Sequence, residues 1–324
     1  MEDFKYLIPE ESIDAIITNV EKLREIENHL RHVFSRYGYN EVLMPSFEYV
    51  DLYTQLDTGF EPDKMFQYIN HEGKNVAMRV DFTIPLARLY ANSHSDKEAR
   101  YSYFGKVYRK EMMHKGRSSE FFQGGVELMN KPGLEGDKEI MTMIQECMPF
   151  LSLKHTIIEI GSAKFFNRLL ALAGEHRDEL ITILKYRKIS SMKKFVSENQ
   201  FDDSFAELLL KLPTCFGDIH LLEQIIACIK DPVLYEALTD LKKLYDSLEN
   251  QKGIIFDLGM VPTMKYYTGL MIKGYSDQSA SLIISGGRYD KLLPRFQVDS
   301  GAIGFCFHMN HILKAIEKEG EDND

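Results

Sequence analysis

Apolar positions in the first third of the chain predict a helix, a hairpin and a second helix. Hydrophobic side chains recur near helical spacing over residues 13–37, and Gly38 supplies a C-terminal stop. Short apolar runs at 66–69 and 76–80 are separated by a loop that contains glycine, which predicts a β-hairpin. Residues 84–90 predict a helix with a proline in its first turn.

One long segment further along the chain differs in texture from its surroundings. Residues 163–250 are rich in Leu, Lys and Glu at helical periods, with breaks at proline and glycine, and predict an all-helical insertion. A last helix is expected over 308–318. Strand-like or extended runs elsewhere are residues 42–45, 101–111, 125–129, 156–160, 253–258, 267–274, 281–285 and 301–307.

These patterns predict an α+β fold. We expect a mostly antiparallel sheet flanked by helices, formed by residues 1–162 and 251–324 and interrupted by the helical insertion at 163–250. A polar loop at 112–120 joins two of the expected strands. The sequence shows no internal repeat, so a repeat architecture is excluded.

Composition and charge narrow the class of partner. The chain has 324 residues, 44% of them hydrophobic and 11% aromatic, which is enough apolar surface for a folded core. Lys and Arg number 39 against 49 Asp and Glu, so the net charge is −10 and no basic run is present. This charge counts against a protein that grips tRNA broadly, although a negative charge also simply keeps a protein soluble.

The cysteines and the N-terminus exclude several other classes. The cysteines show no CxxC spacing and stand among apolar neighbours, so we expect buried thiols rather than a metal cage or disulfides. Residues 1–11 are acidic without an apolar leader, and no run is long enough to span a bilayer. We therefore expect a cytoplasmic protein without a metal. The cysteines are Cys147, Cys215, Cys228 and Cys306.

Asp81 is the first candidate for a functional side chain. It lies just after an expected strand and just before an expected helix, within the run from Met78 to Arg88. A carboxylate in that position can accept from a ligand ammonium. It can equally serve as the N-cap of the helix, and spacing alone favours the cap.

A second candidate is a row of polar side chains on two expected strands. If residues 105–111 pair with 123–127, alternation brings Arg109, Glu111, Gln123 and Glu127 to one face of the sheet. Polar side chains within apolar strands are costly unless they face solvent or a ligand. The face is therefore either an ordinary solvated surface or a trap for a zwitterion.

Tyrosines and glycines near the C-terminus form a third candidate. Tyr266 and Tyr267 precede Gly269, and Tyr289 follows a glycine pair in Ser-Gly-Gly-Arg-Tyr-Asp. Glycines in strands often mark a close backbone approach. The tyrosines either cover a ligand or belong to the core with a hydroxyl group attached, and the residues alone favour the core.

At these motifs the chain resembles the class II aminoacyl-tRNA synthetase core, specifically that of histidyl-tRNA synthetase, over segments 5–161 and 251–318. Residues 37–45 resemble motif 1, which forms the dimer interface in that fold. Residues 108–117 resemble motif 2, the strand-loop-strand that holds ATP, and 304–313 occupy the place of motif 3. The runs at 79–88 and 116–128 are most similar to the regulatory subunits of ATP phosphoribosyltransferase, synthetase paralogues that serve histidine biosynthesis.

The resemblance implies a histidine pocket. Asp81 and Thr83 would lie near the α-amino group, and Arg109, Gln123 and Glu127 would form a polar wall. Two tyrosines would lie close to the ligand. Carboxylates suit an ammonium, an arginine suits a carboxylate, and glutamate or a tyrosine hydroxyl accepts from an imidazole N–H. The implied set is Asp81, Thr83, Arg109, Gln123, Glu127, Tyr267 and Tyr289.

Departures from the synthetase pattern argue against catalysis. His311 stands where motif 3 ends in an arginine, and Pro262 replaces the arginine of the histidine-specific loop, in which Lys265 replaces an aspartate. Fixed cations stabilise the charge that develops during adenylation, and losing one such group typically costs about two to three orders of magnitude in rate. No anticodon-binding domain is expected after the motif 3 helix.

The resemblance thus implies a regulatory subunit of ATP phosphoribosyltransferase that is not itself an enzyme and needs no cofactor. It would assemble with a short-form catalytic subunit as a homodimer within a hetero-oligomer, with histidine as effector and without tRNA or membrane. One alternative is a truncated synthetase-like enzyme that forms histidyl-adenylate. Another is a structural module whose pocket binds no ligand.

Overall fold

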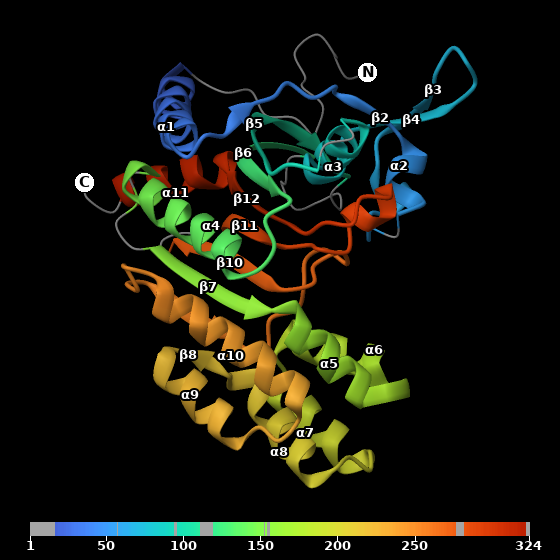
Figure 1. The fold of residues 1–324 in the computed structure, drawn as a ribbon, viewed down its shortest axis with the longest axis vertical. Helices are drawn as coiled ribbons and strands as arrows, with labels where there is room; N and C mark the ends of the chain where they lie inside the picture. Colours follow the sequence, from blue (N-terminus) through green and yellow to red (C-terminus); the bar gives the residue numbers. More distant parts are fainter. Residues whose placement is uncertain are drawn as a thin grey trace, which may run out of the picture.

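Figure 1 shows the fold as a computed structural model built around a nine-stranded sheet. The structure describes residues 17–56, 58–93, 96–110, 119–151, 153, 156–276 and 282–321. The strand order is β1-β5-β6-β12-β11-β10-β7-β9-β8. Only the β1–β5 and β7–β9 pairs are parallel, so the expectation of a mostly antiparallel sheet in an α+β fold is confirmed. The strands span β1 Asn40–Glu41, β5 Ala99–Tyr108, β6 Glu120–Met129, β7 Thr156–Ser162, β8 Phe216–Gly217, β9 Ile254–Asp257, β10 Leu270–Ser276, β11 Leu282–Arg288 and β12 Ala302–His308.

A small three-stranded sheet stands beside the main one. The predicted hairpin is confirmed as β3 (Gln67–Ile69) and β4 (Asn75–Met78), which pair antiparallel. β2 (Phe47–Tyr49) adds a third strand to β4. In Figure 1 the hairpin projects from the body of the molecule beside α2 (Val50–Thr54).

Helices of the core cover the sheet as the hydrophobic periodicity predicts. The first expected helix is α1 (Ile17–Arg36), and Gly38 follows it with φ of 79° as its stop. The helix expected at 84–90 is α3 (Thr83–Asn92), with a proline in its first turn. α1, α4 (Leu134–Cys147) and α11 (Met309–Glu321) lie along one side of the sheet in Figure 1.

The described segment predicted as a helical insertion consists of six α-helices and two short 3-10 helices apart from the short strand β8. Aspartates cap three of these helices, because Asp202, Asp218 and Asp231 each accept from the backbone N–H two residues ahead. β8 joins the edge of the main sheet through β9, which the sequence pattern did not predict. The helices are α5 Ala163–Ala173, α6 Arg177–Tyr186, α7 Ile189–Glu198, α8 Asp203–Lys211, α9 Ile219–Cys228 and α10 Pro232–Ser247.

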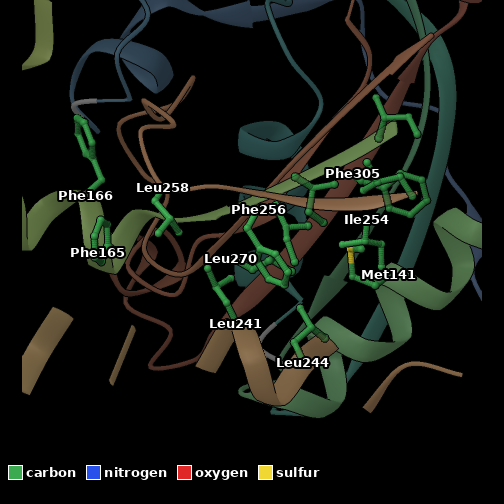
Figure 2. Packing of buried hydrophobic residues seen from close by; sticks show 14 of the residues in the cluster. Met141, Phe165, Phe166, Leu241, Leu244, Ile254, Phe256, Leu258, Leu270 and Phe305 are labelled. Carbon is green, nitrogen blue, oxygen red and sulfur yellow. The ribbon is translucent and has the colours of Figure 1, made fainter. Parts of the chain in front are cut away.

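One hydrophobic core runs from the sheet into these helices. Buried side chains of α4, α5, α10, β9 and β12 belong to a single cluster. Figure 2 shows Leu241 and Leu244 reaching from α10 toward Phe256 of β9, with Met141 of α4 nearby. The inserted helices therefore complete the core that covers this side of the sheet.

On the opposite face of the main sheet, part of β6 and β12 carries small and polar side chains, next to a second hydrophobic cluster that includes Tyr103 and Met129. Because side chains alternate along a strand, Val126 and Leu128 face the core while Gly125 and Glu127 face the other way. Gly304 lies directly opposite Glu127 in the β12–β6 register. The space left by glycine makes this face the place where a cavity can form.

A buried arginine holds β11 to the start of α4. Arg288 donates to Asp137 at 2.7 Å, to Asp290 at 3.0 Å and to the Gly133 carbonyl at 2.8 Å. A buried guanidinium needs such partners because desolvation is costly. The arginine of the Ser-Gly-Gly-Arg-Tyr-Asp run is thus part of the framework around the site.

Two local expectations need correction. Residues 42–45, expected as an extended piece, connect β1, which ends at Glu41, with β2, which begins at Phe47. β5 ends at Tyr108, short of the expected 111, and Glu111 lies outside the described residues. Cys228 is exposed at the end of α9, because it lies on a solvent-facing turn, whereas the other three cysteines are buried as predicted.

No helix in the described part of the chain is long and apolar enough to cross a bilayer.

Candidate functional site

A cavity of about 160 Å³ lies on the glycine-rich face of the sheet. Side chains from the β4–α3 connection, the strands β6, β11 and β12 and the 263–267 loop enclose it. The structure brings together around it all the residues of the predicted histidine pocket. These are Asp81, Thr83, Arg109, Gln123, Glu127, Tyr267 and Tyr289.

Glu127 is a buried carboxyl group of the cavity. Thr83 Oγ1 donates to its Oε1 at 2.5 Å, and the Tyr289 hydroxyl donates to its Oε2. Burial raises the pKa of Glu127 to about 8, while the two hydroxyl donors oppose the rise. Gly304 makes room for this carboxylate, since a Cβ there would lie 1.9 Å from Oε2.

Asp81 fulfils both interpretations of its position. Its Oδ2 accepts from the backbone N–H of Ile84 at 3.3 Å, which caps the start of α3. Its Oδ1 is buried and has no hydrogen-bond partner among the described residues. Burial raises the pKa of Asp81 to about 7, while Arg109 opposes the rise. A buried oxygen without a donor is a ready acceptor for a ligand N–H.

Arg109 supplies positive charge to the cavity, although it lies beyond the end of β5. Its Nε donates to the Val80 carbonyl at 2.8 Å, and its guanidinium lies 5.3 Å from the centre of the Phe60 ring. The predicted strand face with Glu111 is therefore not how Arg109 reaches Gln123 and Glu127. The side chain folds back over the β4–α3 connection instead.

Aromatic rings close the remaining sides. Tyr266 makes edge contacts with Tyr267 and Tyr289 at 5.4 and 5.7 Å between ring centres. Phe82 stacks on Tyr103 at 4.1 Å. Tyr266 and Tyr289 are buried and Tyr267 is half-buried, so these tyrosines both pack as core and line the cavity.

Among the cavity residues not predicted as site residues from the sequence, three lie together. Ser285 Oγ lies 2.9 Å from His308 Nε2 and 3.4 Å from Cys306 Sγ, and all three side chains line the cavity. Burial, with His311 and Arg109 nearby, lowers the pKa of His308 to about 3, so its imidazole is neutral. Alternation along β12 was an available signal, because positions 304, 306 and 308 share the face of Glu127.

The positions that differ from synthetases do not line the cavity. Pro262 and Lys265 flank its loop, and Lys265 is exposed beside Gly59. His311 lies one turn beyond His308, where its Nδ1 is 2.7 Å from the Leu282 carbonyl. Within the described ranges no group of three or more His, Cys, Asp or Glu is placed to hold a metal ion.

Known proteins resemble this chain in both fold and sequence. The histidyl-tRNA synthetase family model matches residues 14–312. The ATP phosphoribosyltransferase regulatory subunit of Lactococcus lactis subsp. lactis (strain IL1403) is 45% identical over 329 residues, covering 100% of both chains. The regulatory subunit of Bacillus cereus (strain G9842) is 28% identical over 99% of this chain and 78% of its own.

A solved structure agrees with the sequence relatives. A Bacillus halodurans protein described as an ATP phosphoribosyltransferase regulatory subunit/histidyl-tRNA synthetase superposes with a TM-score of 0.89 at 25% identity. The match covers 98% of this chain and 84% of that one. Fold and cavity thus define a protein of the histidyl-tRNA synthetase class. Within that class, the chain belongs to the family of ATP phosphoribosyltransferase regulatory subunits.

Proposed function

We propose that this chain is a non-catalytic subunit that assembles with a short-form ATP phosphoribosyltransferase catalytic subunit and makes the complex responsive to histidine. The 45% identity with a regulatory subunit over the whole chain supports the assembly. The observation that carries the histidine response is the unpaired Oδ1 of Asp81 in a cavity that also holds Arg109.

The cavity matches the polar groups of histidine. Asp81 Oδ1 accepts from the ammonium group, and Arg109 attracts the carboxylate. Glu127 and the Tyr289 hydroxyl offer further acceptor capacity to an imidazole N–H, since each carboxylate oxygen accepts more than one hydrogen bond. Histidine feedback then requires that the ligand bind one state of the complex better than another.

Absence of catalysis is the second part of the proposal. His311 is held by the Leu282 carbonyl beside the cavity, and Pro262 carries no charge, so neither position supplies the arginine that synthetases direct at pyrophosphate. We expect no histidine-dependent exchange of pyrophosphate into ATP and no aminoacylation. Exchange well above a buffer control would favour a truncated enzyme that forms histidyl-adenylate.

Isothermal titration calorimetry of histidine tests the main proposal. The titration is made with the chain alone and again with the catalytic subunit present, and the activity of the complex is followed at each histidine concentration. We expect histidine to bind and the complex to lose activity over the same range. Inhibition without binding to this chain, alone or in complex, would place the effector site on the partner.

A further inference from the structure

We propose that His308 and Ser285, together with Arg109, hold the carboxylate of the amino acid bound in the cavity. The inference deepens the proposed function and rests on it. Neither His308 nor Ser285 was among the residues expected to contact a ligand. Their hydrogen bond of 2.9 Å and their place in the cavity wall suggest the role.

The polar groups of the cavity divide into an acidic end and an end of neutral hydrogen-bonding side chains. Glu127 lies opposite Gly304, whereas Gln123 lies opposite His308. The two pairs are four residues apart on the same strands, which is about 13 Å along the sheet. Glu127 with its two hydroxyl donors occupies one end, and His308, Ser285 and Gln123 occupy the other.

Charge decides which end receives a carboxylate. Asp81 and Glu127 repel it when they are ionised, and Asp81 already raises the pKa of Glu127. Arg109 is the one Lys or Arg among the described residues that line the cavity. Its positive charge acts on both Asp81 and His308, so both the ammonium acceptor and the His308 wall are within its range. An α-amino acid carries its ammonium and carboxylate on one carbon, which matches this placement.

Hydrogen counting shows that His308, Ser285 and Cys306 together keep a donor for the ligand. A neutral imidazole has one N–H, a serine has one O–H and a thiol has one S–H. The contacts of Ser285 with His308 and with Cys306 use two of these three hydrogens. The third remains at the cavity wall, on the imidazole, the hydroxyl or the thiol. A carboxylate is the ligand group that rewards such a donor most, because charge-assisted hydrogen bonds are the stronger ones.

The test compares histidine with histamine, which has the same imidazole and amine but no carboxylate. Calorimetry on the full chain gives the ratio of the two dissociation constants. We expect His308→Ala to weaken histidine roughly 10- to 100-fold while histamine binding stays the same. Ser285→Ala should reduce the preference in the same direction. His308→Asn, which retains an N–H donor, should restore much of it.

A matched control separates ligand contact from folding. His311→Ala removes a neighbouring histidine whose ring lies 5.6 Å from that of His308 but does not line the cavity, and it should change the ratio far less than His308→Ala does. Equal weakening of both ligands by His308→Ala, or an unchanged ratio, would overturn the carboxylate role while leaving histidine binding intact. If the unmodified chain binds neither ligand, the proposed function fails, and this inference fails with it.

Discussion

Individual carboxyl groups of the cavity are held at a cost to the free protein. Burial raises the pKa of Asp81 to about 7 and that of Glu127 to about 8. Asp81 Oδ1 has no donor in the described part of the chain, whereas both oxygens of Glu127 have one. Such unpaired buried groups are typical of binding sites, where a ligand supplies the missing partner.

The pH dependence of stability follows from the raised pKa of Asp81. Below its unfolded value of 3.8 both states hold the proton, and between 3.8 and about 7 the folded state holds more protons. Stability from this group is therefore present at low pH and is lost as the pH rises through that window. We expect Asp81→Asn to gain stability relative to the unmodified chain on going from about pH 5 to about pH 8. Urea unfolding at both pH values measures this.

Asp202 provides a control of opposite sign. Hydrogen bonds from Ser204 lower the pKa of this exposed helix cap, so its contribution is present above 3.8 and is lost on acidification. Asp202→Asn should therefore show the same change in the free energy of unfolding between about pH 5 and about pH 8 as the unmodified chain. If the free energy of unfolding changed with pH by the same amount in Asp81→Asn and in the unmodified chain, the burial of Asp81 would be contradicted.

Histidine feedback should depend on the wall of the cavity. We expect Gln123→Ala or Glu127→Ala to leave the subunit folded and able to assemble but to remove its response to histidine. Losing one buried partner costs binding about 1–3 kcal/mol, or roughly one to two decades in affinity. The histidine inhibition curve of the reconstituted complex measures the shift. An unchanged midpoint in both variants would mean that the effector binds elsewhere.

Between elements, the close approach of β6 and β12 makes the cavity possible. Gly304 faces Glu127 across the strand pair, and a Cβ there would also lie 2.5 Å from the Val126 carbonyl. Gly125 is equally crowded, with the Phe305 carbonyl at 2.5 Å. These glycines are needed for space rather than for an unusual backbone conformation, since both lie within regular strands.

Gly304→Ala should therefore damage the site and the sheet together. The added methyl displaces the Glu127 carboxylate or spreads the strands, at a cost of about 1–3 kcal/mol in the free energy of unfolding. Chemical denaturation and histidine calorimetry measure the two effects. Cys306→Ala, two residues along the same face, removes volume instead of adding it and should cost less. Equal stability of Gly304→Ala and the unmodified chain would show that the strands tolerate the methyl.

At the scale of the whole molecule, the inserted helices and the sheet share one core. Leu241 of α10 and Phe256 of β9 are buried in the same cluster (Figure 2). Arg187, at the end of α6, also pairs with the buried Asp257 of β9. Contacts of this kind make separate unfolding of the insertion unfavourable.

Leu241→Ala tests this unity. The cavity left behind should lower the free energy of unfolding by about 2–5 kcal/mol and should do so for sheet and insertion alike. Hydrogen exchange can follow peptides from β6 and from α9 separately. Tyr235→Ala, on the same helix but 48% exposed, is the matched control and should change little. Loss of protection confined to the helices would show that the insertion unfolds alone.

Assembly of two copies is expected through the region from Arg36 to Tyr53. Leu43 is 91% exposed there and Phe47 is 50% exposed, which leaves apolar surface for a partner. We expect light scattering to show a dimer at micromolar concentration and Leu43→Asp to weaken it. A monomer at that concentration, alone and with the catalytic subunit, would contradict a dimeric building block.

The amino-acid sequence alone predicts most helices and strands and the protein family. Helix α3, the β3–β4 hairpin and the inserted helices follow from local periodicity, because each pattern reflects which face of a short segment is buried. The family follows from combined motifs and is confirmed by the match over residues 14–312. Even so, the pattern extended β5 to residue 111, because alternation continues past the point where strand pairing stops.

The arrangement of the site depends on tertiary contacts. Asp81 caps α3 with one oxygen and leaves the other unpaired, and that outcome depends on which distant groups pack around it. His308 and Ser285 are 23 residues apart in the chain. They meet because β12 pairs with β11 in one particular register. Strand register and the desolvation of side chains depend on contacts between segments far apart in sequence, so local sequence patterns do not predict them.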